Sequence, residues 1–194
     1  SRQCRIVSAS SANRSGRSRN SASVTSTETM GVVSYSRGSS IRVDKRIALG
    51  AAQLTVADLV RAGTGSTLVI TDTANNLGVA GNDDAERLIV SAWSTTLPTL
   101  SGSVNSGAGG PAGILPGYYI DAGTNSFVSY NATTGFQPLL STATPGAGQV
   151  AYSNIISSAT VTAGFNAGTA TVDLTGAGAF TRQDNPYLYA LRIN

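Results

Sequence analysis

Short strand-like segments, separated by glycine and proline, follow one another along the chain from Met30 onward. Ile41, Val43 and Ile47 alternate with charged residues, and a period of two is typical of a half-buried β-strand. The pattern predicts eight or nine strands, with 150–163 forming one bent strand or two. The predicted strands cover residues 31–37, 41–47, 67–73, 87–97, 117–122, 126–132, 150–163, 169–175 and 187–193.

Evidence for helix is confined to residues 55–62, where Thr55 is a candidate N-cap and Gly63 a stop signal. Many strands, glycine- and proline-rich turns and almost no helix predict an all-β protein. Its simplest form is an eight-stranded antiparallel β-sandwich of the jelly-roll type. No internal repeat of fixed period is visible, which argues against a propeller or a β-helix.

Positive charge is concentrated toward the N-terminus. Nine of the 13 Lys and Arg residues lie in the first 46 positions beside two acids, Glu28 and Asp44, so this segment carries +7. The remaining 148 residues hold four basic and eight acidic side chains and carry −4. A basic segment ahead of a weakly acidic body is suited to binding a polyanion.

Residues 1–29 consist mainly of Ser, Arg, Asn, Ala and Thr, with no aromatic residue. Such a segment buries too little apolar surface to offset its ordering entropy. We therefore expect a flexible basic arm over 1–29 and one folded domain over 30–194. A Ser/Arg-rich, acid-poor segment is also typical of an organelle transit peptide. Weak helical amphipathicity, and basic residues that continue into the predicted domain, favour the arm.

Charged side chains are scarce in the second half of the chain. Between Arg87 and Arg182 the only ones are Asp121 and Asp173. A free monomer usually needs more surface charge to stay soluble. The scarcity indicates a surface covered by other copies of the chain. The alternative is an ordinary Ser/Thr/Gly-rich β domain that its hydroxyl groups keep soluble.

The sequence offers little for catalysis. It has no histidine and one cysteine, Cys4, which removes the usual general base and the commonest zinc ligand. Asp83, Asp84 and Glu86 form an acidic cluster without the spacing of a calcium loop, so a solvated turn is expected there. The glycines of 107–113 lack the lysine and the strand–helix frame of a phosphate-binding loop. We expect no enzyme activity, no metal and no cofactor.

Two features concern the compartment. A single cysteine allows no intrachain disulfide and fits a reducing environment. No apolar run approaches the roughly 20 residues that cross a bilayer, so no membrane contact is expected.

The basic residues predict sequence-independent binding to nucleic acid. Guanidinium groups suit phosphate oxygens, and no aromatic residue precedes Tyr35 to stack on bases. Arg42 and Arg46 share one face of a predicted strand. That face either extends the basic surface into the domain or is plain exterior charge. The predicted nucleic-acid-binding residues are Arg2, Arg5, Arg14, Arg17, Arg19, Arg37, Arg42, Lys45 and Arg46.

In layout, the chain resembles the coat proteins of small icosahedral plant RNA viruses, with the sobemovirus-, tombusvirus- or ourmiavirus-like arrangement of arm and shell. The resemblance rests on the arginine-rich arm at 1–29, the strands of 30–194 and the terminal strand at 186–194. It implies a jelly-roll shell domain that self-assembles into an icosahedral capsid and packages viral RNA through its arm. It also implies a virion protein that is assembled in the host cytoplasm.

A second interpretation belongs to a different class of protein. The Gly/Ser/Thr/Asn-rich loops, together with Tyr118 and Tyr119, could form the binding surface of a carbohydrate- or receptor-binding β-sandwich in a fibre or surface layer. The basic segment would then be an anchor.

Overall fold

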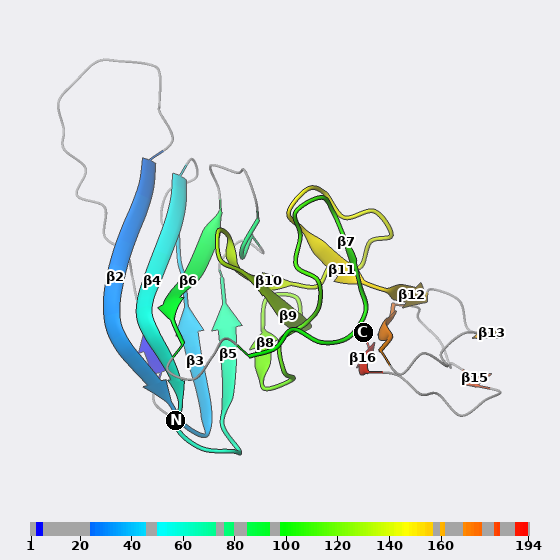
Figure 1. Cartoon of the computed structure of the whole chain (residues 1–194), viewed down its shortest axis with the longest axis horizontal. Coiled ribbons are helices and arrows are strands. Elements are labelled where there is room, and N and C mark those ends of the chain that lie inside the picture. The colour runs from blue at the N-terminus through cyan, green and yellow to red at the C-terminus, as the bar shows by residue number, and fades with distance from the viewer. Residues whose placement is uncertain are drawn as a thin grey trace, which may run out of the picture.

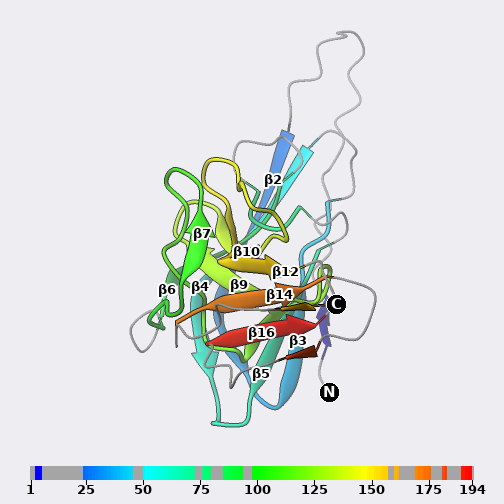
Figure 2. The same ribbon diagram turned by 90° about the vertical axis from the view of Figure 1, so that its right-hand side faces the viewer.

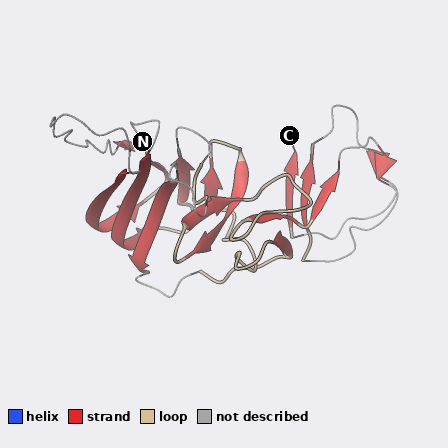
Figure 3. Cartoon of the chain, turned by 90° about the horizontal axis from the view of Figure 1, so that it is seen from above, coloured by secondary structure: helices blue, strands red, loops and turns tan. Residues whose placement is uncertain are grey.

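In the N-terminal part of the chain, and again in its C-terminal part, consecutive strands alternate between two sheets, so that each pair of strands stacks on the pair before it. Sixteen strands and no helix occur within the described part of the computed structural model (Figures 1 and 3). The structure describes residues 3–5, 24–45, 50–72, 76–79, 85–93, 98–156, 160–161, 169–175, 181–182 and 189–193.

The N-terminal stack contains two mainly parallel sheets. One sheet has the order β2-β4-β6 and is built from β2 (Val24–Tyr35), β4 (Gly50–Arg61) and β6 (Glu86–Ala92). The other begins β1-β3-β5-β8, from β1 (Gln3–Arg5), β3 (Gly38–Arg42), β5 (Thr67–Thr71) and β8 (Tyr119–Asp121). Figure 1 shows β2, β4 and β6 side by side at one end of the molecule.

The spacing between stacked strands is irregular. Val24 pairs with Gly50, 26 residues later, Gly38 with Thr67 after 29 residues, and Ala52 with Glu86 after 34. Loops of different length therefore separate strands that stack in register. Because these loops differ in length, the sequence has no fixed period although its strands stack in parallel. The absence of a repeat, which argued against a β-helix, therefore does not exclude parallel stacking.

Antiparallel strands join the two ends of the molecule. The second sheet continues through β9 (Ser126–Asn131) and β10 (Gly135–Pro138), which form hairpins with their neighbours. A separate antiparallel pair is formed by β7 (Val104–Ser106) and β11 (Val150–Tyr152).

The C-terminal stack repeats the alternation on a smaller scale. One sheet has the order β12-β14-β16 and consists of β12 (Asn154–Ile156), β14 (Thr171–Leu174) and β16 (Ala190–Ile193), side by side in Figure 2. The strands β13 (Thr160–Val161) and β15 (Thr181–Arg182), which come between them in the chain, pair with each other. All these pairings are parallel.

The two sheets of the N-terminal stack enclose the larger core, in which Tyr119, Tyr130 and Phe136 pack with aliphatic residues. Gly135 lies where the β9–β10 hairpin meets β6. It has φ +81°, and a Cβ there would overlap the carbonyl oxygen of Leu88. Glycine is therefore required for this close approach. A smaller core around Tyr152 lies between the hairpins and the C-terminal stack.

The prediction of an all-β protein is confirmed. The prediction of antiparallel pairing is wrong for most of the described part. Eight of the eleven strand pairings there are parallel and three are antiparallel. The described ranges hold no helix long and apolar enough to cross a membrane.

The predicted helix at 55–62 is wrong, because these residues belong mainly to β4. Ala52, Leu54 and Val56 are buried at alternate positions, as expected of a strand. Parallel pairing with β2 on one side and β6 on the other overrides the local helix signals.

Several predicted strands are found with other bounds. β5, β8, β9 and β16 are shorter than predicted, and β6 covers 86–92 instead of 87–97. β3 shares only Ile41 and Arg42 with the strand predicted at 41–47. The segment predicted as one or two strands at 150–163 contains three, β11, β12 and β13. In β14, Thr171, Val172 and Asp173 are all buried, so both faces of this strand are covered. β1 and the first residues of β2 lie within the segment predicted as a flexible arm. The rest of that arm is outside the described residues.

Candidate functional site: interaction surfaces of the stacks

The structure brings two of the nine predicted nucleic-acid-binding residues together. In the parallel pairing of β1 with β3, Arg5 is the register partner of Arg42. β1 is the edge strand of this sheet, so the two residues occupy neighbouring backbone positions at the edge. Five others lie outside the described residues, namely Arg2, Arg14, Arg17, Arg19 and Arg46.

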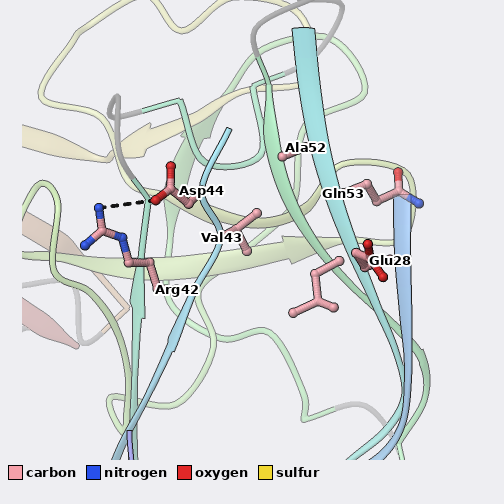
Figure 4. Close-up of a pocket in the computed structure, with 7 residues that line it drawn as sticks. Glu28, Arg42, Val43, Asp44, Ala52 and Gln53 are labelled. Atoms are coloured by element: carbon pink, nitrogen blue, oxygen red, sulfur yellow. Dashed lines mark ion pairs between the residues drawn. The ribbon is translucent and has the colours of Figure 1, made fainter. Parts of the chain in front are cut away.

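Acidic side chains share the surroundings of Arg42. A shallow hollow between the two sheets is lined by this arginine together with Glu28, Val43, Asp44, Ala52, Gln53 and Leu54 (Figure 4). Within it, Nη2 of Arg42 lies 3.6 Å from Oδ2 of Asp44. Two acids and one base do not make a phosphate site, and an exposed ion pair contributes little to stability. The charges that line the hollow therefore do not favour a phosphate group there.

Arg37 and Lys45 lie at opposite ends of β3. Arg37 forms the exposed β2–β3 corner with φ 54°, and its backbone N–H donates to Oγ of Ser66 at 3.2 Å. The backbone N–H of Lys45 donates to Oε1 of the buried Glu86 at 2.8 Å. The structure therefore spreads the described basic residues along β3 rather than gathering them into one patch.

The buried acids do not form a cation site. Burial raises the pKa of Asp72, and the nearby carboxyls of Asp121 and Glu86 raise it further. Asp121 instead closes the β8–β9 turn, accepting bonds from the backbone N–H and hydroxyl of Thr124 at 2.7 and 2.6 Å. No group of three metal-ligating side chains is found among the described residues. Asp83 and Asp84 lie outside them.

Tyr118 and Tyr119, proposed above as a binding surface, have different surroundings. Tyr119 is buried in the larger core, and its ring contacts that of Trp93 edge-on at 6.2 Å between centroids. The guanidinium of Arg61 lies 3.7 Å from the centre of the Tyr118 ring. Only Tyr118, partly exposed, is placed to contact a ligand.

Two glycine-rich loops, 107–113 and 143–149, interlock into one surface. The backbone N–H of Gly107 donates to Gln149 O at 3.1 Å, and that of Gly148 donates to Ala108 O at 2.8 Å. The side-chain amide of Asn105 donates to the carbonyl oxygen of Ala143. A Cβ at Gly107 would overlap the backbone of the other loop. The two loops therefore hold each other in place and present ordered, uncharged polar groups.

The sheet edge at β16 is the most apolar exposed surface of the described part. Tyr189, Leu191 and Ile193 are the large hydrophobic residues exposed there. Arg192 points to the opposite face, where its guanidinium donates to Thr124 O at 2.6 Å and lies 3.1 Å from Asp173. An exposed apolar edge strand favours pairing with another strand.

The chain matches no known protein family, no curated protein and no solved structure.

Sequence reasoning found the terminal strand but missed its edge position and the Arg192–Asp173 pair. A signal for the pair was present, because Asp173 is one of two charged residues between Arg87 and Arg182. A lone charge within a β-branched strand requires a partner when the strand is buried on both faces. Nothing in the sequence indicated that the loops at 107–113 and 143–149 lie together.

Proposed function

We propose that this chain is a scaffold segment of a fibre or surface layer, whose stacked strands form the body and whose loops bind carbohydrate or a receptor. The observation that supports it is the alternation of consecutive strands between parallel sheets, which occurs in both stacks. In such a stack each strand pair contacts mainly its neighbours. The body then extends in one direction and presents long side surfaces for binding.

The interlocked loops 107–113 and 143–149 are the proposed binding surface. They offer backbone carbonyl and amide groups, and their side chains are uncharged. Groups of this kind form hydrogen bonds with the hydroxyls of a sugar, which carry no charge either. Because the loops hold each other through backbone bonds, a ligand would meet a surface that is already ordered, which lowers the entropic cost of binding.

A glycan array tests this proposal, with Asn105→Ala as the variant that removes the side-chain bond between the loops. We expect defined glycans to bind the unmodified chain and to bind this variant less. Val32→Ser is the matched control, because Val32 lies on β2, away from the strands β7 and β11 that the loops adjoin (Figure 1), and its change should leave binding intact. Absence of any glycan or receptor binding, together with retained nucleic acid, would contradict the proposal.

A second candidate function is an RNA-packaging coat protein whose basic arm binds the RNA. It is favoured by the +7 charge of the first 46 residues and by the register that places Arg5 beside Arg42. Negative-stain microscopy for closed particles and the ratio of absorbance at 260 and 280 nm test it. Single-stranded RNA binding should then have a log–log salt slope of about −3.5 to −5 for five to seven phosphates per chain.

A further inference from the structure

A small hollow adjoins the loop 143–149, at the point where this loop ends and β11 begins. Two of the residues that line it, Gln149 and Thr124, are polar and partly exposed. No charged side chain belongs to its lining. Most of the wall is apolar and is formed by Leu77, Val79, Pro138, Leu140 and Val150.

The wall of the hollow is held in place by the side-chain amide of Gln137. Its Nε2 donates to Gly78 O at 2.8 Å and to Gly148 O at 3.0 Å. These bonds tie the segment 76–79 to the loop 143–149. A group that enters the hollow therefore meets a surface whose shape is set before binding.

The side-chain amide of Gln149 has a defined orientation. Its Oε1 accepts a hydrogen bond from the backbone N–H of Gly146 at 2.8 Å, and only the oxygen of an amide can accept. Nε2 of the same amide has no hydrogen-bond partner in the described part of the chain. Because Gln149 lines the hollow, these N–H groups are within reach of a carbonyl oxygen bound there.

The size of the hollow limits what it can hold. Its volume is about 40 Å³. One water molecule needs roughly 10–15 Å³ of such space, so the hollow takes about three non-hydrogen atoms. An acetyl group has this size. A charged group would lose its hydration without gaining a counter-charge, because the lining is uncharged.

We propose that this hollow is the subsite for the N-acetyl group of an acetamido sugar. The methyl group packs against the apolar wall, and the carbonyl oxygen accepts a hydrogen bond from Nε2 of Gln149. The sugar ring then lies over the adjoining loops, whose carbonyl and amide groups meet its hydroxyls. The inference rests on the proposed function and deepens it, because it names the class of glycan.

Calorimetric titration with matched pairs of oligosaccharides tests the inference. The members of a pair differ only in an acetamido group that replaces one hydroxyl: oligomers of N-acetylglucosamine against glucose, and of N-acetylgalactosamine against galactose. In at least one pair, we expect the acetamido member to bind at least ~10-fold more tightly, because a hydroxyl neither fills the apolar wall nor brings the carbonyl acceptor.

Gln149→Glu keeps an oxygen for the N–H of Gly146 but replaces the donor with a second acceptor. It should weaken binding of the acetamido sugar at least ~10-fold and remove the preference within the pair. Leu140→Phe, which fills the hollow without adding charge, should have the same effect. Gln53→Glu is the matched control, because it makes the same change on β4 of the N-terminal stack and should leave binding intact.

Saturation-transfer NMR of the unmodified chain provides a second measurement. The methyl protons of the acetyl group should receive the strongest transfer, because they lie deepest in the hollow. Glycans that bind without any preference for the acetamido member would overturn the inference and leave the proposed function standing. An equal loss of affinity in Gln53→Glu and Gln149→Glu would also overturn it. Absence of binding by every glycan would overturn the inference together with the carbohydrate-binding function.

Discussion

Arg192 on β16 and Asp173 on β14 are register partners in a parallel sheet, and their charged groups lie 3.1 Å apart. The same guanidinium donates through Nε to Asn125 O at 3.1 Å and through Nη2 to Thr124 O at 2.6 Å. Both carbonyl groups belong to the turn between β8 and β9. One side chain therefore connects the C-terminal stack to the hairpins that follow the N-terminal stack.

Arg192→Ala should lower the free energy of unfolding by about 3 kcal/mol, because it leaves the buried carboxylate of Asp173 without its counter-charge. Urea unfolding monitored by Trp93 fluorescence and by circular dichroism measures the change. Arg42→Ala is the matched control, since its ion pair with Asp44 is solvent-exposed and its loss should cost less than about 1 kcal/mol. Equal effects of the two variants would contradict the structural role given to Arg192.

Gly135→Ala should destabilise the protein by about 2 kcal/mol, since the position has φ +81° and a methyl group there would overlap Leu88 O. Gly31→Ala, on β2, has no atom within 4 Å of the added methyl group and should change stability by no more than ~0.5 kcal/mol. Thermal unfolding of both variants tests this contrast. A stable Gly135→Ala variant would mean that the β9–β10 hairpin does not approach β6 so closely.

Tyr130→Phe should destabilise the protein by about 1–3 kcal/mol. The Tyr130 hydroxyl accepts a bond from the backbone N–H of Val90 and donates one to the C=O of the same residue, both at 3.0 Å. Val90 lies on β6, at the edge of its sheet, and removal of the hydroxyl leaves two buried backbone groups without partners. Tyr189→Phe, at an exposed position, should leave the unfolding midpoint unchanged in the same denaturant titration.

Asp72→Asn should make the protein more stable at neutral pH. Burial raises the pKa of Asp72 above its ordinary value of 3.8, so its ionisation on the native chain opposes folding. For a carboxyl whose folded pKa is raised, stability is highest below pH 3.8 and declines as the pH rises through the folded pKa.

The advantage of the Asp72→Asn variant should therefore be absent near pH 3 and grow above about pH 4. Unfolding titrations of both proteins across this range measure it. The amide oxygen keeps an acceptor for the N–H of Leu77, now 2.8 Å from Oδ2. A variant that is less stable than the unmodified chain at pH 7 would contradict the prediction.

The local pattern of the sequence predicted many of the strands. Alternation at Ile41 and Val43 predicted the buried face of β3 and of the residue that follows it, and both side chains are buried. The alternating pattern does not predict which strands pair with each other. Neighbours in the parallel stacks lie between 18 residues apart, for Asn154 and Val172, and 51 apart, for Leu68 and Tyr119. An alternating segment buries the same residues whether its neighbour runs parallel or antiparallel, so the pattern does not predict strand direction.

The candidate site was less accessible to sequence reasoning than the fold. Helix signals at Thr55 and Gly63 were strictly local and were overridden by the pairing of β4 on both sides. The distribution of basic residues suggested a binding segment, yet a charge count carries no information on which residues become neighbours. Only the register of β1 against β3 places Arg5 beside Arg42.

The uneven spacing of the stacked strands has an evolutionary consequence. A corner between two strands can gain or lose residues while the columns above and below keep their partners, because register depends on the strands and not on the loops. Insertions at such corners would diversify what the protein contacts without refolding its body. A fold of this kind can therefore change its surface faster than its architecture.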